Sequence, residues 1–239
     1  MRRGNAAAGV IAYFQSYSNT YVDPERFQQM LAALEPHLGD PVVCVSVATR
    51  PDTLPDWALA RLGELARRVA VWVELGLEVA DDRLLLEINR LHTVADFRSA
   101  VARVQAVGLD AIGHAILGLP GDGREGARRT ASVLRETGVR GVKVHQMMVL
   151  EKTVLAHWWR AGRVTPLDLE TYVVWLADFV EQLGGDQVLH RLTGDAADGE
   201  LLAPRWKVHK NRIRYLLEAE LALRGTEQGS CSAYPALGR

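Results

Sequence analysis

Ionisable side chains interrupt several apolar stretches of this sequence, close to the points where those stretches end. In chain order they are Glu74, Glu78, His114, Lys143, His145, His190 and Arg191. Such groups are costly to bury inside apolar segments unless they are paired or have a function. A hydrogen bond in the core would explain any single member of this set. Their recurrence at the ends of successive segments instead predicts a functional site. The candidate catalytic residues are Lys143, His145, His190 and Arg191.

Two kinds of chemistry follow from these residue types alone. Burial lowers the pKa of a lysine toward the range in which it is a nucleophile, so Lys143 would suit a Schiff base in an aldolase-like enzyme. Three imidazoles are also a sufficient donor set for a metal ion in a hydrolase. Those imidazoles would come from His114, His145 and His190. The sequence holds no closely spaced His-x-His or His-Glu-x-x-His signal, which weakens the metal alternative.

Six short apolar segments alternate with amphipathic helices and would position these side chains. The predicted strands span residues 10–16, 42–48, 70–76, 111–117, 141–147 and 187–192. Strands that are apolar on both faces predict a parallel sheet covered by helices. In a parallel barrel the site lies at the C-terminal ends of the strands, where the ionisable groups occur. Because side chains alternate along a strand, Lys143 and His145 share a face, as do Glu74 and Glu78.

The number of strands decides between two α/β architectures. Six strands are too few for a closed eight-stranded barrel, so they favour either a partial barrel or an open doubly wound sheet. No glycine-rich phosphate loop follows any of the predicted strands, which argues against the nucleotide-binding form of the open sheet. We predict a single domain over residues 1–224, and a disordered tail of small and polar residues over 225–239.

Composition excludes some classes of function. The 239 residues are 48% hydrophobic and carry 28 Lys and Arg against 29 Asp and Glu, a formal net charge of -1. No global field therefore attracts the chain to nucleic acid or to a membrane. No apolar run approaches the roughly 20 residues that span a bilayer. The two cysteines, Cys44 and Cys231, give no disulfide framework, so we predict a cytoplasmic protein.

A basic run near the end of the chain supports a third, non-catalytic interpretation. It consists of Arg205, Lys207, His209, Lys210, Arg212 and Arg214. Such a run on a helix would suit RNA binding. Charges at this spacing spread around a helix, so a solvated terminal helix is the favoured interpretation.

Several segments, in order along the chain, resemble the YhcC-type family of radical S-adenosylmethionine (SAM) proteins, which is related to the Elongator catalytic subunit. They are YFQSYSNTY (13–21), TRPD (49–52), VELGLE (73–78), INR (88–90), ILGLPG (116–121), GVKVH (141–145) and HRLTGD (190–195). Each match is modest by itself, and their shared order makes the resemblance specific.

The resemblance implies a partial (β/α)6 TIM-like barrel of the radical SAM type that lacks its first strand. In the family, that strand leads into a Cys-x-x-x-Cys-x-x-Cys loop, whose thiolates hold a [4Fe–4S] cluster. The sequence has no such triplet. We therefore expect the chain to begin inside a longer protein, to be inactive alone, and to expose residues 10–16 as an apolar edge strand.

The resemblance also implies roles for individual residues. Gln15 and Ser16 would hold the amino and carboxylate groups of the SAM methionine. Glu78 stands where a polar residue, commonly glutamine, meets the ribose hydroxyls, and Arg90 would pair with the methionine carboxylate. His114 and the turn at Gly118 would border the adenine.

The substrate is the least constrained part of the prediction. The segment from His145 to Thr153 departs from the family pattern by one histidine and one glycine, and this region would face the substrate. The relationship to Elongator makes RNA a candidate substrate by analogy only. The resemblance defines how a radical is generated and leaves the reacting hydrogen atom unspecified.

Overall fold

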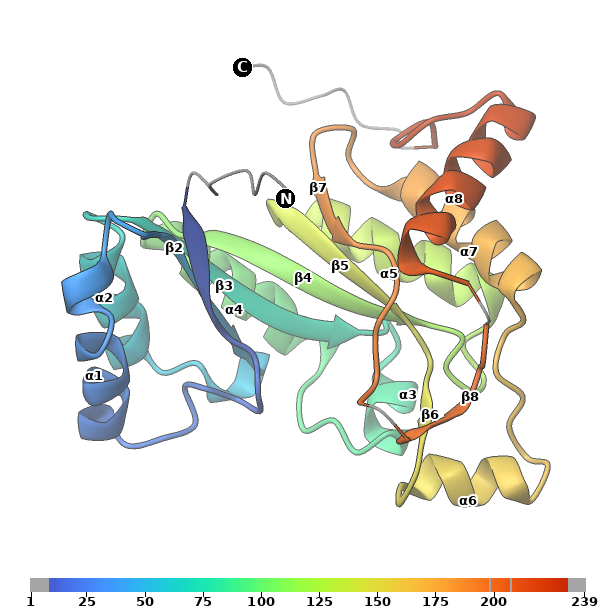
Figure 1. The fold of residues 1–239 in the computed structure, drawn as a ribbon, viewed down its shortest axis with the longest axis horizontal. Helices are drawn as coiled ribbons and strands as arrows, with labels where there is room; N and C mark the ends of the chain where they lie inside the picture. The colour runs from blue at the N-terminus through green and yellow to red at the C-terminus, as the bar shows by residue number, and fades with distance from the viewer. Residues whose placement is uncertain (1–8, 198, 207, 232–239) are drawn as a thin grey trace, which may run out of the picture. The chain divides into compact units, whose positions relative to one another are not determined.

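The computed structural model describes residues 9–197, 199–206 and 208–231. Six strands form one sheet in the order β1-β2-β3-β4-β5-β7 (Figure 1). Their bounds are β1 Val10–Phe14, β2 Val42–Thr49, β3 Ala70–Glu78, β4 Asp110–Leu117, β5 Gly141–Gln146 and β7 Val188–Arg191. The pairs β1–β2, β2–β3 and β5–β7 run parallel. Every strand expected from the apolar segments is present, within a few residues of its predicted ends.

Helices follow the strands in sequence. They are α1 Pro24–Ala32, α2 Asp56–Leu65, α3 Asp82–Glu87, α4 Val94–Ala106, α5 Gly123–Glu136, α6 Val154–Arg160, α7 Leu169–Gln182 and α8 Lys210–Arg224. Short 3-10 turns occupy Glu35–His37 and Pro51–Thr53. A second, two-stranded sheet pairs β6 Val149–Leu150 with β8 Leu201–Ala203 in antiparallel fashion. No helix in the described ranges is long and apolar enough to span a bilayer.

The chain divides into two compact units, and the single domain over residues 1–224 stays a prediction. The first unit contains residues 1–76 and 95–112, and the second contains 77–94 and 113–239. Two of the three boundaries fall inside strands: the first residues of β3 and β4 belong to the first unit and their last residues to the second. The third boundary falls after the first residue of α4. All the groups described below lie within a single unit.

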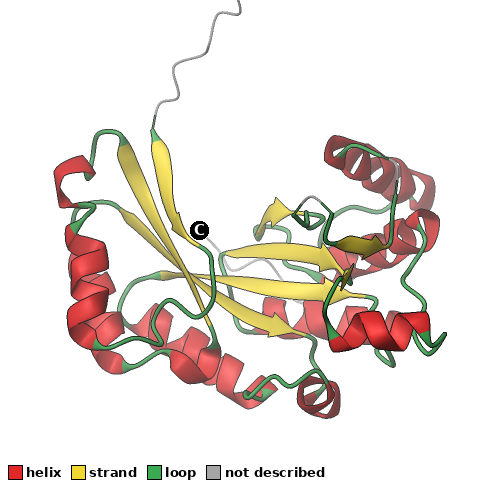
Figure 2. Cartoon of the chain, turned by 60° about the horizontal axis from the view of Figure 1, so that its bottom comes forward, coloured by secondary structure: helices red, strands yellow, loops and turns green. Residues whose placement is uncertain are grey.

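In the first unit, helices α1 and α2 lie on the same side of β1 and β2 (Figures 1 and 2). Asp23 caps α1, as its sequence predicts: the carboxylate accepts a 2.7 Å hydrogen bond from the Arg26 amide, and Pro24 occupies the first turn. The ring of Phe27 packs edge-on against Trp57, with centroids 5.5 Å apart. This contact joins α1 to α2.

Glu74 is buried in the first unit and has hydrogen-bond partners on both neighbouring strands. Tyr13 Oη donates to its Oε2 at 2.8 Å, and Ser46 Oγ donates to its Oε1. The carboxylate is 1% exposed. Because hydrogen bonds offset the cost of burying a charge, Glu74 is explained as a group that ties β1, β2 and β3 together.

The second unit contains an apolar cluster and a helical layer. The cluster consists of Val79, Leu84, Leu85, Leu119, Met147 and Val164. It supports α3, a helix that the apolar periodicity of the sequence did not predict. Asp81 caps α3 by accepting hydrogen bonds from the amides of Arg83 (2.9 Å) and Leu84 (3.2 Å). Helices α5, α7 and α8 pack against one another in the same unit.

Residues 225–231 do not form the disordered tail that was predicted. Gly225, at φ 67°, ends α8 in the left-handed region. Gln228 Nε2 then donates to the carbonyls of Gly184 and Gln187, both at 2.7 Å, and the Cys231 amide donates to the Glu181 carbonyl at 2.9 Å. These bonds satisfy carbonyls at and after the end of α7, which a helix cannot pair internally. The rest of the predicted tail, residues 232–239, lies outside the described residues.

Candidate functional site

The C-terminal end of β3 presents an ion pair between two residues of the predicted SAM site. Arg90 Nη2 lies 3.0 Å from Glu78 Oε1, and the two side chains are 25% and 14% exposed. Glu78 has φ 65°, and Asn89, which directly precedes Arg90, has φ 57°. Both are non-glycine residues in the left-handed region. Such conformations cost energy and cluster at functional sites. The Arg90 amide donates to Leu85 O at 2.8 Å, which anchors the turn.

Arg90 retains a buried donor. Its Nε is buried and has no hydrogen-bond acceptor among the described residues. Buried donors in native proteins are nearly always satisfied, so a bare Nε indicates an acceptor supplied by a ligand or by water. Nη2 of the guanidinium therefore pairs with Glu78, whereas Nε is buried without an acceptor among the described residues.

A second group of the predicted residues meets on β4, β5 and β7. The rings of His114 and His145 are stacked, with centroids 6.0 Å apart and planes 23° from parallel. Arg191 Nη1 lies 3.5 Å from His145 Nε2. Lys143 is 8% exposed, and its Cα pairs in register with that of Arg191. The arrangement gathers cationic and imidazole groups that would suit an anionic ligand or proton transfer.

Other predicted residues are not joined to this group by the contacts described above. His190 precedes Arg191 on β7, at the point where the register of the β5–β7 pairing shifts. Gln15 and Ser16 follow β1 in the first unit, where both are exposed. Glu78, Arg90, His114 and Gly118 all belong to the second unit. Two groups of the predicted residues thus form contacts within the second unit, Glu78 with Arg90 and His145 with His114 and Arg191, whereas Gln15 and Ser16 belong to the first unit.

At two positions in the second unit, a neighbouring side chain lies so close to the backbone that only glycine fits. Gly118 has φ 88°, and a Cβ there would come within 2.9 Å of the Leu167 side chain. At Gly194 a Cβ would come within 2.4 Å of His145 Nδ1. Real Cβ atoms do not approach this closely, so a side chain at Gly194 would displace the His145 ring.

A buried carboxylate at the start of α5 was not predicted from the sequence. The Asp122 side chain is 1% exposed, and neither of its oxygens has a hydrogen-bond donor among the described residues. Burial raises the pKa of Asp122 to about 6; Arg129, whose Nη2 lies 4.0 Å away, opposes the shift, and Asp81 adds to it. The Pro-Gly-Asp-Gly order at residues 120–123 was the available signal, but it does not distinguish a buried aspartate from an exposed turn residue.

Gln146 was also missed. Its side-chain Oε1 accepts hydrogen bonds from the Gly194 amide and from Thr193 Oγ1, both at 2.8 Å, and its Nε2 donates to Gly194 O at 3.0 Å. These three bonds fix the segment that follows β7. A single glutamine in an apolar strand carries no sequence signal for such a role.

The residues present do not fit an iron–sulfur cluster. Cys44 is buried in β2, where desolvation raises its pKa to about 11, whereas Cys231 is exposed beyond α8. Cluster ligation requires several deprotonated thiolates around one point. No group of three or more His, Cys, Asp or Glu residues within the described ranges could hold a metal ion. The same finding removes support from a metal site built of His114, His145 and His190.

Comparison with known proteins gives relatives over most of the chain. The family described as Radical_SAM C-terminal domain matches residues 139–222. The protein YtqA of Bacillus subtilis is 34% identical over 223 residues, which cover 92% of this chain and 67% of YtqA. Protein YhcC of Escherichia coli is 33% identical over 203 residues, which cover 84% of this chain and 65% of YhcC. The chain thus spans about two thirds of the length of these relatives.

A solved structure supports the fold. The archaeal Methanocaldococcus infernus Elp3 with an N-terminal deletion matches with a TM-score of 0.79 at 17% identity, over 92% of this chain and 55% of Elp3. At this identity the likeness concerns the fold alone, and it confirms the six-stranded partial barrel of the radical SAM type that the sequence predicted. Together with the two sequence relatives, it shows that the chain belongs to the YhcC-type family of radical SAM proteins.

Proposed function

We propose that this chain forms the SAM-binding and substrate-facing part of a radical SAM enzyme, and that the cluster ligands come from residues outside these 239. SAM bound beside a reduced cluster supplies a one-electron route to abstraction of a hydrogen atom. The residues of this chain would bind and orient SAM and present the substrate. We also propose a cytoplasmic location, which the two free thiols support.

The Glu78–Arg90 pair is the observation that carries the proposal. A carboxylate at the end of a barrel strand accepts hydrogen bonds from two neighbouring hydroxyls, which is the pattern a ribose diol offers. The buried Nε of Arg90 would donate to the methionine carboxylate while Nη2 holds Glu78 in place. Gln15 and Ser16 would bind the methionine end, and His114 and Gly118 would border the adenine.

The cationic group on the later strands is proposed to face the substrate. His145 stacks with the His114 ring, and its Nε2 lies 3.5 Å from Arg191 Nη1. An imidazole in this setting would hold or transfer a proton at a substrate oxygen or nitrogen. Lys143 and His190 stay candidates on sequence grounds. Borohydride trapping with a carbonyl substrate would favour the alternative in which Lys143 forms a Schiff base.

The proposal is tested by calorimetric titration of SAM into the 239-residue chain and into the full-length protein. We expect weak binding to the short chain, because its residues would supply only part of the contacts that SAM makes in a complete radical SAM enzyme. In the full-length protein, Glu78→Ala removes charge-assisted hydrogen bonds worth about 1.5 to 3 kcal/mol, so SAM affinity should fall by about tenfold or more. Glu78→Gln should retain most of the affinity, because an amide still accepts and donates to the diol.

Matched controls lie on the exposed face of α3 in the same unit. Glu87→Ala and Arg83→Ala remove the same charges from exposed positions and should leave SAM affinity unchanged. Equal affinity in the wild type and in Glu78→Ala would show that the β3 end is not the ribose site. Tight SAM binding by the 239-residue chain would refute the expected dependence on the cluster.

A further inference from the structure

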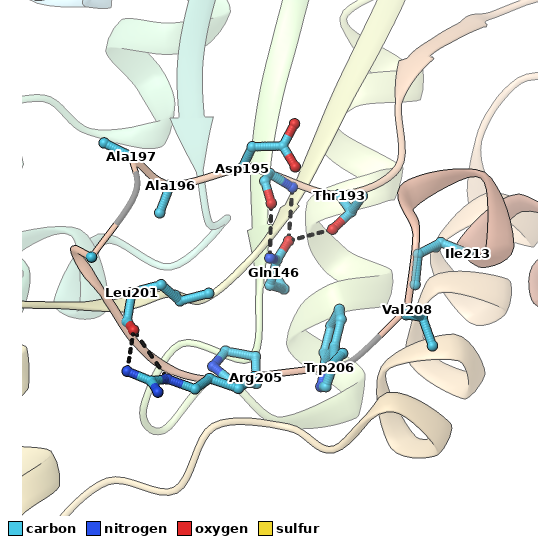
Figure 3. Close-up of a pocket in the computed structure, with 13 residues that line it drawn as sticks. Gln146, Thr193, Asp195, Ala196, Ala197, Leu201, Arg205, Trp206, Val208 and Ile213 are labelled. Carbon is cyan, nitrogen blue, oxygen red and sulfur yellow. Dashed lines mark hydrogen bonds between the residues drawn. The ribbon is translucent and has the colours of Figure 1, made fainter.

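A cavity of about 510 Å³ lies in the second unit, within the segment that connects β7 to α8 (Figure 3). Its volume falls in the range of small-molecule sites, roughly 300 to 1,000 Å³. The segment leaves β7 at Thr193, passes through β8 and reaches α8 beyond Val208, and Gln146 of β5 closes the remaining side. None of the lining residues belongs to the set proposed above for SAM.

Hydrogen bonds and strand pairing hold parts of the frame of the cavity. The three hydrogen bonds of Gln146 hold Thr193 and Gly194, and the β6–β8 pairing holds Leu201 and Ala203. Gly194 lines the cavity and also lies against the His145 ring. Its backbone thus forms part of a thin wall between the cavity and His145. A ligand in this cavity would therefore lie next to the cationic group on β5 and β7.

An aromatic ring forms part of the lining. Trp206 packs against Tyr172 with ring centroids 4.7 Å apart, and its indole Nε1 donates to Leu167 O at 3.2 Å. Tyr172 Oη in turn donates to Leu192 O at 2.6 Å. The indole is therefore held in one orientation before any ligand arrives. Leu201, Pro204, Val208 and Ile213 add apolar surface. These side chains, together with the polar groups of Thr193, Asp195 and Arg205 in the same lining, suit a planar ligand that also carries polar groups.

Positive charge gathers at the same place. The Arg205 guanidinium is held at the rim by two hydrogen bonds from Nε (3.2 Å) and Nη2 (3.0 Å) to Leu201 O, and Figure 3 shows Asp195 on the opposite side of the cavity. No carboxylate among the described residues pairs with Arg205. Helix α8 begins just beyond Val208, which also lines the cavity, and has no acidic residue in its first turn. The N-terminal end of α8 adds to this positive potential.

We propose that the cavity binds a nucleoside monophosphate unit, with the base beside Trp206 and the phosphate at Arg205 near the start of α8. A base supplies the planar group that stacks on an indole, and a phosphate supplies the anion that a guanidinium binds. A free nucleotide and an unpaired nucleotide of single-stranded RNA share this chemistry. The basic run that the sequence singled out then has a local role, although the net charge of the chain is -1.

Titration calorimetry with defined probes tests the proposal on the 239-residue chain and on the full-length protein. The probes are UMP, AMP, uridine, adenosine and a single-stranded octauridylate. We expect at least one monophosphate to bind about tenfold more tightly than its nucleoside. Arg205→Gln should abolish that difference and leave nucleoside binding unchanged. Ala196→Phe, which places a ring in the cavity, should abolish binding of every probe while the thermal unfolding transition is retained.

Arg163→Gln is the matched control, because it removes the same charge from an exposed position of the same unit. The proposal is wrong if no probe binds, if nucleoside and monophosphate bind alike, or if Arg205→Gln and Arg163→Gln have the same effect. If octauridylate binds more tightly than UMP and this affinity depends on Arg205, the ligand is RNA. If the two probes bind with equal affinity, the ligand is a free nucleotide. Titration of SAM into Arg205→Gln distinguishes the two proposals. If no nucleotide binds the wild type but SAM binds both proteins, the nucleotide site is wrong and the SAM site is unaffected.

Discussion

Asp122 is a carboxylate whose environment favours the protonated form. Its side chain is almost fully buried and has no hydrogen-bond donor among the described residues, while the nearest guanidinium nitrogen is 4.0 Å away. The folded state therefore holds a proton on Asp122 more tightly than the unfolded chain does, since burial raises the pKa from 3.8 to about 6. Between these two values the folded state binds more protons, so stability falls as pH rises.

Asp122→Asn should remove this pH dependence. At pH 4 the variant and the wild type should be similarly stable, because both carry a neutral side chain. At pH 7.5 the variant should be more stable, by at most about 3 kcal/mol, since each pKa unit corresponds to about 1.4 kcal/mol. Urea unfolding at a series of pH values measures the difference. A variant that is less stable than the wild type at pH 7.5 would show that ionised Asp122 has a favourable partner.

At this scale, charged residues inside apolar strands could be predicted from the sequence. Residues whose role depends on contacts formed by the tertiary fold could not. His114, His145 and Arg191 were singled out because charged groups in apolar strands are unusual, and they meet in the structure. Gln146 is polar but uncharged, and its importance arises only where the chain returns at Gly194. Burial of that kind is a property of the tertiary fold, which residue types and spacing do not encode locally.

At the scale of elements, one buried aspartate joins three helices of the second unit. Asp178 of α7 is 1% exposed and contacts arginines from α5 and α8. Arg124 Nη2 and Arg224 Nη1 both donate to Asp178 Oδ1 at 2.8 Å, and Arg128 Nη2 lies 3.2 Å from the same oxygen. Burial opposes ionisation here, but the hydrogen bonds from Arg124 and Arg224 outweigh it and hold the pKa of Asp178 below its usual value.

Asp178→Asn should destabilise the second unit by about 1.5 to 3 kcal/mol at pH 7, because it removes the buried charge that three guanidinium groups share. Arg128 and Arg224 keep other carboxylate partners, which limits the loss. The stabilisation is present above the unfolded pKa near 4 and is lost as pH falls through the lower folded pKa. Denaturant unfolding at pH 7 and pH 3 should therefore show the gap between variant and wild type closing in acid. Glu125→Gln breaks an exposed pair with Arg128 and should cost less than about 1 kcal/mol.

The elements themselves were predictable to different degrees. All six strands of the main sheet and the cap of α1 at Asp23 follow from apolar runs and capping chemistry. Helix α3 has only six residues, too few for a periodic pattern to emerge. Strands β6 and β8 have two and three residues and exist because they pair with each other. Short elements of this kind depend on tertiary contacts.

At the scale of the whole molecule, β1 is expected to drive self-association. It occupies the end of the sheet order within the described residues, and its Val10 and Ile11 side chains are 44% and 49% exposed. An apolar edge without charge or proline is a template for pairing with another chain. Sedimentation velocity of the 239-residue chain should show concentration-dependent species, and Ile11→Lys should shift them toward the monomer.

Leu223→Lys provides the comparison, since Leu223 is 83% exposed on α8 and lies far in sequence from any strand edge. It should leave self-association unchanged. A wild-type chain that sediments as one monomeric species at every concentration would mean that β1 is protected by some other feature. Equal effects of the two substitutions would indicate general apolar association rather than strand pairing.

The 239-residue chain should also fail to assemble a cluster. Its two thiols lie in different units, and the pKa of Cys44 is raised to about 11, so thiolate ligands are not available together. Anaerobic reconstitution with iron and sulfide should give a colourless protein with far less than one cluster per chain, measured by absorbance and iron analysis. A stable brown product with stoichiometric iron would contradict this expectation.

The contrast between the two cysteines makes the chain suitable for site-specific labelling. At neutral pH a maleimide reacts with the thiolate form, so exposed Cys231 should react rapidly while buried Cys44 stays protonated and inert. The Cys231 amide is bonded to the Glu181 carbonyl, so an attached fluorophore would lie beside the end of α7. Its anisotropy would then report when residues 225–231 detach from that helix, before the rest of the second unit unfolds.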